Sequence, residues 1–372
     1  MNKLTYITYQ TFPSQKANTI QTIENLKYLG KIFDVELIFP DRDKKSSGKL
    51  RDIQEFYSFN EEFKISIKRH NFPFGKVHFL EKYLYIFSHF LWARSLCKEI
   101  YEEIKNDYIF TRSDWIFFFL SRKNLNITFE CHQITKIRPW IIRKSIHNSN
   151  SKVICLNKKI MEDLKIDSKY KDKVIVLHNG VDAKNYVKSD DSNRNELIFI
   201  GNLKRFNENR NLKFVINCFK NKKIKSNFTM KIIGGPIEEL VLLRKFIKDQ
   251  SLQDKVELLE WIPREKVLNE IEKSGIGLLI NSSKDKHSVL YTSPLKYFEY
   301  LYAGLNIIAV NFHAHKTLPY SENIEFFDEN NEESFINALN NFPSQSNNLT
   351  KEELRGITLE FRAKEIFNFI KK

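Results

Sequence analysis

The chain has few of the residues that hold small secreted or metal-bound folds together. Only four cysteines occur in 372 residues, far apart and without a Cys-x-x-Cys pair. We therefore expect neither a zinc site nor a disulfide framework, and no metal ligands are assigned; a reducing cytosol fits best. Long apolar runs are missing too, since the longest, YLYIFSHFLWA at 83–93, is too short to span a bilayer. No signal peptide is expected either, because the first residues lead directly into a strand-like pattern.

Several signatures of common enzyme classes are also absent. The sequence contains no GxSxG, no HExxH, no glycine-rich P-loop and no GxGxxG. The motif evidence for serine hydrolases, zinc peptidases, P-loop nucleotidases and classical dinucleotide enzymes is therefore missing.

The composition that is present indicates a large folded protein with a basic first half. Apolar residues make up 42% of the chain, including 31 phenylalanines, so disorder is not expected. A length of 372 residues exceeds what one core usually supports and predicts two domains. The net charge is +14; residues 1–180 hold 31 basic and 20 acidic residues, and the rest hold 29 and 26. This excess indicates an anionic partner (a phosphorylated substrate, an acidic membrane surface or nucleic acid) or simply a genome that favours lysine.

Short apolar runs alternate with helical patterns along the chain, which is typical of parallel α/β layers. The first series of expected strands is LTYITY (4–9), VELIF (35–39), YIFT (108–111), ITFE (127–130), KVICL (152–156) and VIVL (174–177). The second series is ELIFIG (196–201), MKIIGG (230–235), VELLEW (256–261), IGLLIN (276–281) and NIIAV (306–310). Two doubly wound domains facing a cleft are therefore expected, separated by the polar stretch 188–195.

We place the first domain at 1–182 and the second at 183–350. Residues 351–372 end in an amphipathic pattern, EELRGITLEFRAKEIFNFIKK. This pattern predicts a helix that returns to the first domain.

The stretch SPLKYFEYLYAG at 293–304 predicts a helix with a site for anions at its start. Ser293 is a favourable N-cap and Pro294 suits the first helical position. Free backbone donors and the helix dipole favour negative charge there. Leu295, Phe298 and Tyr302 are expected to face the core, while Lys296 and Glu299 lie on the other face. An ordinary capped helix with an ion pair three residues apart is the alternative interpretation.

This segment resembles the strongest motif of glycosyltransferase family 4, a Ser-Pro-x-Lys-x-x-Glu helix that precedes a strand. Other blocks resemble the family in the same order over 127–310: FECH (129–132), VIVLHNGVD (174–182), FIGNLKRFNENRNLKFVINCF (199–219), KIIGGP (231–236) and VELLEWIPREKVLNEIEKSGIGLLI (256–280). The resemblance implies the GT-B fold, with two Rossmann-like domains: an acceptor-side domain at 1–182 and a nucleotide-sugar-binding domain at 183–350. It also implies transfer of a sugar from a nucleotide-sugar with retention of configuration.

The resemblance assigns roles to residues by position. Glu299 would bind the ribose, and the backbone of Ser293, Pro294, Leu295 and Lys296 would meet the diphosphate. The other residues implied near the donor are Gly201, Asn202, Gly234, Trp261, Ile262 and His132. Trp261 and Ile262 would flank the nucleobase. His132 would accept a hydrogen bond from a sugar hydroxyl or carry partial positive charge near the diphosphate.

The sequence departs from the family pattern at several positions. Tyr291 stands where the first of two family glutamates would fall, so a contact to the donor sugar is missing or remade. The family's Gly-Arg is Gly201-Asn202 here. Lys204, Arg205 or Arg210 could supply the missing cation, and we favour Lys204 and Arg205 because they lie closer to the strand end.

Two early loops carry further polar candidates. In TYQTFPSQKANTIQT (8–22) they are Ser14, Lys16 and Asn18, for which ordinary turn and cap roles are the alternative. Asp-Arg-Asp at 41–43 superficially resembles a motif of the other large glycosyltransferase fold, and we interpret it as a solvated loop.

The predicted activity is transfer of a hexose from a UDP-sugar to a membrane-associated acceptor. That acceptor would be a lipid-linked saccharide, a lipopolysaccharide core or a diacylglycerol, in bacterial glycolipid or polysaccharide synthesis. Fixed donors and cations, with Lys204, Arg205, Lys296 and His132 as candidate catalytic residues, would neutralise the departing diphosphate without a metal or other cofactor. The expected location is the inner face of the cytoplasmic membrane, and the oligomeric state is open.

Three other classes remain open at this stage. A nucleotide-sugar epimerase of GT-B fold would share the same donor site. A non-catalytic nucleotide-sugar-binding protein is compatible with Tyr291. A nucleic-acid binder would explain the charge, but the usual motifs of such proteins are absent.

Overall fold

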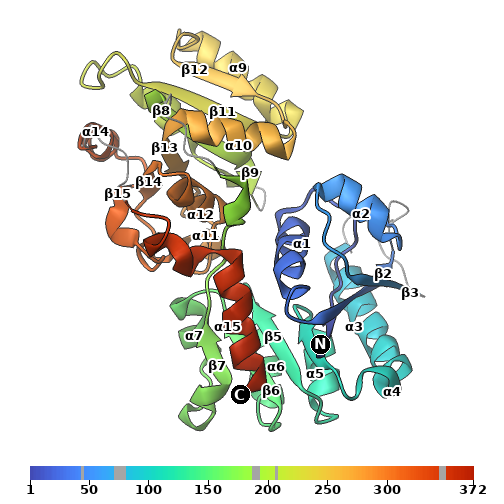
Figure 1. The fold of residues 1–372 in the computed structure, drawn as a ribbon. Helices are drawn as coiled ribbons and strands as arrows, with labels where there is room; N and C mark the ends of the chain where they lie inside the picture. The colour runs from blue at the N-terminus through green and yellow to red at the C-terminus, as the bar shows by residue number, and fades with distance from the viewer. Residues whose placement is uncertain (43–45, 71–80, 187–192, 206–207, 343–348) are drawn as a thin grey trace. The chain divides into compact units, whose positions relative to one another are not determined.

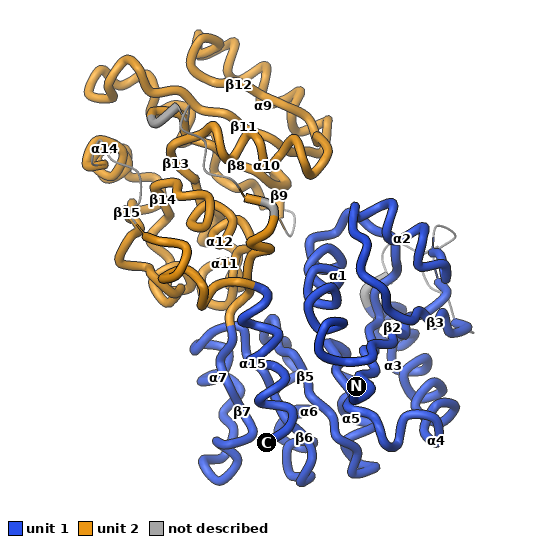
Figure 2. The backbone as a smooth tube through the Cα atoms, in the orientation of Figure 1, with its two compact units in different colours: residues 1–177, 359–372 blue, residues 178–358 orange. Residues whose placement is uncertain are grey.

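The computed structural model describes residues 1–42, 46–70, 81–186, 193–205, 208–342 and 349–372. They form two compact units, residues 1–177 with 359–372 (unit 1) and residues 178–358 (unit 2) (Figure 2). These junctions lie a few residues away from the domain boundaries expected at 182 and 350. Asp43 and most of the polar stretch 188–195 lie outside the described residues.

Unit 1 is built on a seven-stranded parallel sheet with the order β3-β2-β1-β4-β5-β6-β7 (Figure 1). Its strands are β1 (Lys3–Ile7), β2 (Asp34–Asp41), β3 (Lys64–Arg69), β4 (Tyr108–Thr111), β5 (Ile127–Cys131), β6 (Ser151–Cys155) and β7 (Val174–Val176). The chain runs outward from β1 to β3 in one direction and from β4 to β7 in the other. The winding therefore reverses between β1 and β4.

Helices connect the strands of unit 1. They are α1 (Ala17–Leu29), α2 (Leu50–Tyr57), α3 (Glu81–Glu99), α4 (Tyr101–Ile104), α5 (Asp114–Ser121), α6 (Arg138–Ser145), α7 (Lys158–Leu164) and the C-terminal α15 (Leu359–Lys371). Helix α15 packs against α1, and its Ile366 and Phe369 join the core around Leu26 and Phe33. The last helix of the chain is thus part of unit 1.

Unit 2 is built on a six-stranded parallel sheet with the order β12-β11-β8-β13-β14-β15. Its strands are β8 (Asn193–Asn202), β11 (Thr229–Gly235), β12 (Val256–Leu259), β13 (Ser274–Leu279), β14 (Asn306–Val310) and β15 (Ile324–Phe327), with a small hairpin of β9 (Lys204–Arg205) and β10 (Glu208–Asn209). Its helices are α8 (Leu212–Cys218), α9 (Ile237–Asp249), α10 (Arg264–Lys273), α11 (Lys286–Leu290), α12 (Leu295–Tyr302), α13 (His313–Lys316) and α14 (Glu332–Asn340). Here the winding reverses between β8 and β13.

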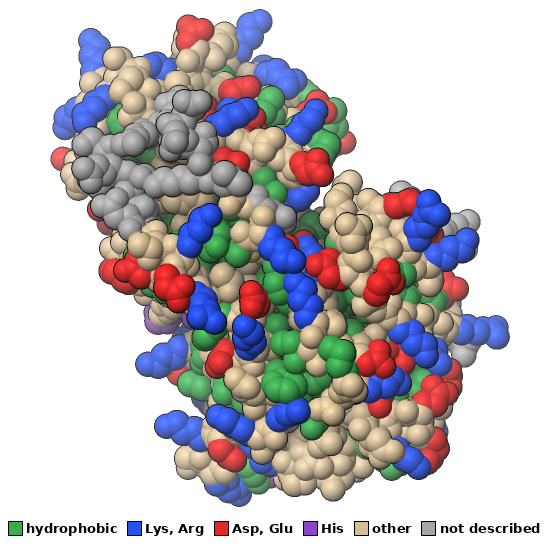
Figure 3. Space-filling model, in the orientation of Figure 1, with side chains coloured by type: hydrophobic (Ala, Val, Ile, Leu, Met, Phe, Trp, Pro, Cys, Tyr) green, Lys and Arg blue, Asp and Glu red, His purple; other side chains and the backbone are tan. Residues whose placement is uncertain are grey.

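The surface carries mixed charge. On the face drawn in Figure 3, Lys and Arg side chains are interspersed with Asp and Glu on each unit. Among the described residues, no helix is both long and apolar enough to cross a membrane.

Candidate functional site

The predicted glycine turn of unit 2 lies where the order in which the chain adds strands to the sheet reverses. In open α/β sheets, ligands bind outside the carboxyl ends of the strands at such a reversal. Here the point lies between β8, which ends at Gly201 and Asn202, and β13, which ends at Leu279. The glycine turn predicted to contact the donor therefore stands at the position that the topology favours for a ligand.

Two glycines allow β8 and β11 to approach each other at this edge. Gly201 has a φ of +154°, which side chains rarely adopt, and it pairs with Gly234 across the sheet. A Cβ placed on Gly234 would lie 1.9 Å from the carbonyl oxygen of Gly201. Both positions therefore require glycine, whatever ligand binds there.

Replacing Gly234 by alanine is expected to destabilise unit 2, since the methyl group must push two paired strands apart. Overpacking of this kind costs about 1–3 kcal/mol, and a backbone clash belongs at the upper end. Urea unfolding would measure the change, with Gly48→Ala as the matched control. A Cβ on Gly48 meets only the side chain of Ile67, at 3.4 Å. Equal stability of the two variants would contradict the close approach.

The predicted nucleobase neighbours differ in accessibility. The Trp261 side chain is 51% exposed, and its indole covers Gly235, where a Cβ would lie 2.6 Å from Nε1. An exposed aromatic ring beside the end of β11 is suited to stacking on a base. Ile262 is half-buried and packs against the core of unit 2, and Asn202 is exposed.

The structure favours a different cation after β8 for contact with the diphosphate than the sequence did. Lys204 is 44% exposed and forms an ion pair with Glu239. Arg210 instead lies beside Gly201, and its Nε is buried without a hydrogen-bond partner among the described residues. Burial and the neighbouring Arg205 lower the pKa of Arg210 to about 9. Arg210, which the sequence analysis ranked below Lys204 and Arg205, is therefore the cation with unused donors at this edge.

Arg205 lies close to several polar groups at the same edge. Burial lowers its pKa, and the carboxylate of Asp285 opposes that shift. Arg205 also acts on His315, whose pKa is lowered to about 4 by burial. The Nδ1 of His315 is 2.8 Å from the carbonyl oxygen of Val310, while its Nε2 is buried and has no hydrogen-bond partner in the described part of the chain. The same holds for the side-chain amide oxygen of Asn281, just after β13. Unpaired buried polar atoms thus concentrate where a ligand is expected.

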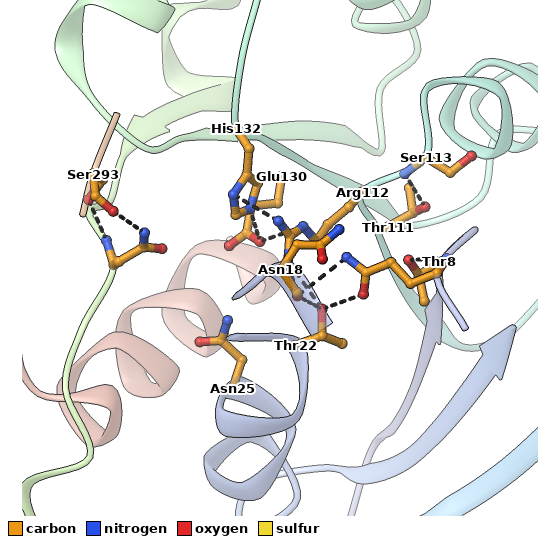
Figure 4. Close-up of polar contacts among 12 residues, drawn as sticks. Thr8, Asn18, Thr22, Asn25, Thr111, Arg112, Ser113, Glu130, His132 and Ser293 are labelled. Carbon is orange, nitrogen blue, oxygen red and sulfur yellow. Dashed lines mark hydrogen bonds and ion pairs between the residues drawn. The ribbon is translucent and has the colours of Figure 1, made fainter. Parts of the chain in front are cut away.

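The start of α12 differs from the prediction by one residue. Pro294, and not Ser293, occupies the N-cap, and no side chain caps the helix. Ser293 is instead committed to the segment that begins unit 2: its hydroxyl accepts from the Asn179 backbone N–H at 3.2 Å, and its carbonyl accepts from the Asn179 side chain at 2.5 Å (Figure 4). The first backbone donors of α12 therefore remain uncapped by any side chain, as an anion site requires.

Glu299 lies one turn into α12 between two cations. Its carboxylate is 2.7 Å from Arg264 and 2.5 Å from Lys296. Burial opposes ionisation, but Arg264 and Lys296 outweigh it and lower the pKa of Glu299 to about 2. Burial also lowers the pKa of Lys296, against the attraction of Glu299. The carboxylate is thus ionised and held in place, and its remaining lone pairs can accept from a diol.

The core face of α12 is broader than predicted. Tyr297, Phe298, Tyr300 and Leu301 are all fully buried, whereas Leu295 is half-buried. Tyr302, also expected in the core, is half-buried as well. The helix packs on both β13 and β14, so more than one stripe of it is covered. Tyr291, in place of the family glutamate, is 3% exposed.

The loop after β1 in unit 1 holds Ser14 in a turn. The Ser14 backbone exchanges hydrogen bonds with the Tyr57 hydroxyl at 2.8 and 2.7 Å. Its side-chain oxygen accepts from the backbone N–H of Lys16 at 3.3 Å. These contacts match the turn role that the sequence left open; the ligand role of Ser14 stays a prediction.

His132 follows β5 and is enclosed by charged neighbours (Figure 4). Its Nε2 is 2.6 Å from Glu130, and its Nδ1 is 2.9 Å from the guanidinium of Arg112. Burial and Arg112 lower the pKa of His132 to about 3. The imidazole is therefore neutral at physiological pH, so it does not carry the partial positive charge that was one of its two expected roles; the positive charge beside it is on Arg112.

Comparison with known proteins identifies the architecture. No protein-family profile matches the chain, and no curated protein is similar enough in sequence to count as a relative. Solved structures do match. HepE of Anabaena, in complex with UDP and glucose, superposes with a TM-score of 0.67 at 10% identity, covering 100% of both chains. WaaB, a lipopolysaccharide outer core galactosyltransferase, gives 0.66 at 12% identity over 99% of both. A glycosyltransferase of Rickettsia africae gives 0.67 at 15% identity over 100% of this chain and 98% of the other.

The fold is GT-B. The two parallel sheets of this chain, with their helices, match the GT-B structure of HepE over the full length of both chains. The fold class predicted from the sequence is thereby confirmed, and the structural neighbours are glycosyltransferases.

Four residues of this GT-B chain, for which no role was predicted, contact either a predicted site residue (Glu299, Ser293 or His132) or its neighbour Glu130. Arg264 and Asn179 lie inside quoted blocks of the sequence, so those blocks contained the signal. Arg112 directly follows the strand YIFT, a position that favours ligand contacts in parallel sheets. Arg362 has no local signal, because only the return of α15 brings it to Glu130. Among the described residues, no group of three or more His, Cys, Asp or Glu is arranged to hold a metal ion.

Proposed function

We propose that this chain is a retaining glycosyltransferase that moves a hexose from a UDP-sugar to a membrane-associated acceptor. The observation that carries the proposal is the Arg210 side chain beside Gly201, whose buried Nε has no hydrogen-bond partner among the described residues, in a GT-B fold. The guanidinium lies over the Phe199 ring, 5.6 Å from its centroid, but no carboxylate of the described residues forms an ion pair with it, so a diphosphate would compensate its charge. The uncapped start of α12, at Leu295 and Lys296, would supply backbone N–H donors to the same anion.

The remaining contacts to the donor follow from the geometry of unit 2. Glu299, ionised between Arg264 and Lys296, would accept from the ribose hydroxyls. Trp261 would stack on the base with its exposed ring. Asn281 and His315 each present an unbonded buried acceptor, which suits the hydroxyls of a sugar.

Sugar transfer breaks the bond between the anomeric carbon and the diphosphate oxygen. Negative charge then builds on the departing diphosphate, where Arg210 and Arg205 would stabilise it as preorganised cations. The acceptor oxygen forms the new bond to the anomeric carbon, and its proton passes to the departing phosphate oxygen. No protein base is needed in this scheme, which agrees with a neutral His132 whose ring nitrogens are both engaged.

A thermal-shift screen against UDP-, GDP- and ADP-sugars tests the donor class. Ligand binding to the folded state raises the melting temperature in proportion to the logarithm of ligand concentration above the dissociation constant. We expect a concentration-dependent rise with one nucleotide, and UDP is the expected one. No rise with any nucleotide-sugar would contradict the proposal.

Exposed apolar side chains on two helices of unit 1 support the proposal that the acceptor is held at a membrane. On α3, the side chains of Tyr83, Ile86 and Phe87 are 71%, 46% and 51% exposed, and on α6 Trp140 is 43% exposed. Helices α3, α5 and α6 pack in succession, so these side chains belong to one helical layer. Exposed aromatic and apolar groups near basic residues favour an anionic membrane surface, at the inner face of the cytoplasmic membrane. Liposome flotation with no preference for anionic lipid at low salt would remove this part of the proposal.

A non-catalytic nucleotide-sugar-binding protein is the second candidate, because Tyr291 replaces a glutamate of the family pattern and is buried. The two candidates differ in turnover. An enzyme consumes its donor slowly by hydrolysis even without acceptor, whereas a binding protein leaves the donor intact.

A further inference from the structure

The cluster around His132 contains more positive than negative charge. Its members lie at the ends of β4 and β5 and on α1 and α15. Arg112 follows β4, Glu130 and His132 belong to the end of β5, and Arg362 belongs to α15. The groups that α1 contributes, Asn18, Thr22 and Asn25, are all uncharged.

Hydrogen-bond chemistry fixes the protonation of His132 in this cluster. A guanidinium has only donors, so the Nδ1 that faces Arg112 at 2.9 Å must be the accepting nitrogen. The proton of the neutral ring is then on Nε2, which donates to Glu130 at 2.6 Å. His132 is therefore an uncharged link between the carboxylate and the guanidinium.

The single carboxylate is shared unequally between the two arginines. Glu130 is fully buried and forms an ion pair with Arg362. The Nε of Arg112 is 3.7 Å from the other carboxylate oxygen, which is beyond hydrogen-bond distance. Burial opposes the charge on Glu130, but Arg362, His132 and Arg112 outweigh it and lower its pKa. Two guanidiniums and one carboxylate leave one net positive charge in the cluster, and Arg112 is the less closely paired of the two arginines.

Arg112 also has unused donors. It donates from one terminal nitrogen to the Asn18 carbonyl and the Thr22 hydroxyl, both at 3.1 Å, and from the other to His132. These bonds use three of its five N–H groups. The remaining two have no hydrogen-bond partner among the described residues. The side chain keeps 9% of its surface exposed, so it is not sealed off.

The position of Arg112 independently indicates a ligand. It directly follows β4, and the winding of the unit 1 sheet reverses between β4 and β1. The crevice outside the carboxyl ends of the strands at such a reversal is the preferred ligand position in open α/β sheets. On the β1 side, Gln10 joins the same network, because its amide donates to Asn18 at 3.3 Å and accepts from Thr22 at 2.9 Å.

We propose that Arg112 binds a phosphate group at the carboxyl end of β4, with neutral His132, Glu130 and Arg362 acting as the positioning residues that orient it. A phosphate accepts paired N–H bonds from one guanidinium and would compensate the excess charge. Helix α15 thereby has a role in unit 1 beyond packing, since it supplies the cation that neutralises Glu130 and leaves Arg112 available. The site complements the proposed donor site of unit 2 but does not depend on it.

Titration of the full-length protein with inorganic pyrophosphate tests this assignment. Pyrophosphate can also enter the unit 2 site, so the comparison is made in the Arg210→Gln background. There, adding Arg112→Gln is expected to weaken pyrophosphate binding at least about tenfold, the effect of one hydrogen bond to a charged group. Arg143→Gln is the control, because within the described ranges this arginine donates a hydrogen bond to the Leu164 carbonyl, on α7, and to no other group. Absence of pyrophosphate binding, or equal affinity with and without Arg112→Gln, would overturn the assignment.

A second measurement avoids the question of whether the variant folds. In wild-type protein the His132 imidazole should show the Nε2–H tautomer by NMR and should not titrate between pH 5 and 8. Pyrophosphate should shift its Nδ1 resonance, because the arginine bonded to that nitrogen is the ligand. An unchanged Nδ1 resonance at saturating pyrophosphate would overturn the proposal.

The source of the phosphate is determined by measuring UDP binding to wild-type protein and to the single variant Arg112→Gln. If the anion is the donor's diphosphate, Arg112→Gln also weakens UDP binding. If the anion belongs to the acceptor, UDP affinity is unchanged and pyrophosphate binds together with UDP. Both results support the site. Failure of the wild-type protein to bind UDP would reject the proposed function and leave the pyrophosphate test standing.

Discussion

Replacing Arg210 by glutamine is expected to weaken UDP binding at least about tenfold, since a hydrogen bond to a charged group contributes roughly 1.5–3 kcal/mol. The unliganded protein should lose no stability and should gain some. The reason is that the buried Arg210 Nε has no hydrogen-bond partner among the residues that the structure describes, and burial beside Arg205 lowers the pKa of this arginine. Removing an uncompensated buried charge relieves a desolvation penalty. Isothermal titration with UDP and urea unfolding would measure the two effects.

Lys204→Gln is the matched control for this prediction. The Lys204 side chain is 44% exposed and is paired with Glu239, so its replacement should change UDP affinity by less than about threefold, as expected of an exposed ion pair. The sequence alone favoured Lys204 over Arg210. A large loss with Lys204→Gln and none with Arg210→Gln would restore that ranking and contradict the structural one.

Replacing Glu299 by glutamine is expected to affect both stability and binding. The change leaves the Arg264 and Lys296 cations without their carboxylate. Breaking a fully buried pair costs about 3–5 kcal/mol. Because Arg264 is 38% exposed and Lys296 24% exposed, we expect about 2–3 kcal/mol here, on the same scale. UDP affinity should also fall at least about tenfold through loss of a charged acceptor for the ribose.

The pH dependence of stability provides a second signature of Glu299. Arg264 and Lys296 overcome burial and lower its pKa from 4.5 to about 2. A lowered carboxyl pKa stabilises the folded state above pH 4.5, and this contribution is lost as the pH falls toward 2. Wild-type protein should therefore lose more stability across this window than Glu299→Gln. Glu239→Gln is the control, since its partner Lys204 is exposed. Parallel pH profiles for wild type and Glu299→Gln would contradict the ion-pair account.

The architecture was predictable because its strands are apolar runs separated by helical patterns. YIFT and NIIAV match β4 and β14 residue for residue. Two strands of the large sheets were missed, β3 (KISIKR) and β15 (IEFF), as was the small hairpin of β9 and β10. Strands β3 and β15 lie at sheet edges and carry charged residues, so they lack the continuous apolar pattern of buried parallel strands. Helix α5 (DWIFFFLS) was missed because it is apolar on nearly every side and shows no helical periodicity.

The site was predictable in its segments but not in its partners. The glycine turns and the α12 segment follow from motif and spacing. Which cation keeps unused hydrogen-bond donors does not follow from motif and spacing, because it depends on contacts from elsewhere in the chain. Glu239 on α9 forms an ion pair with Lys204, while the Nε of Arg210 has no hydrogen-bond partner in the part of the chain that the structure describes. Glu130 similarly depends on Arg362, which is 232 residues away in the sequence. Local patterns carry no information about such long-range pairings.

A crystal structure of the chain with bound UDP would test the central claim most directly. We expect the diphosphate within hydrogen-bond distance of the Arg210 guanidinium and the first backbone amides of α12, with the ribose hydroxyls on Glu299. UDP bound elsewhere, with the Arg210 guanidinium still unbonded, would contradict the account.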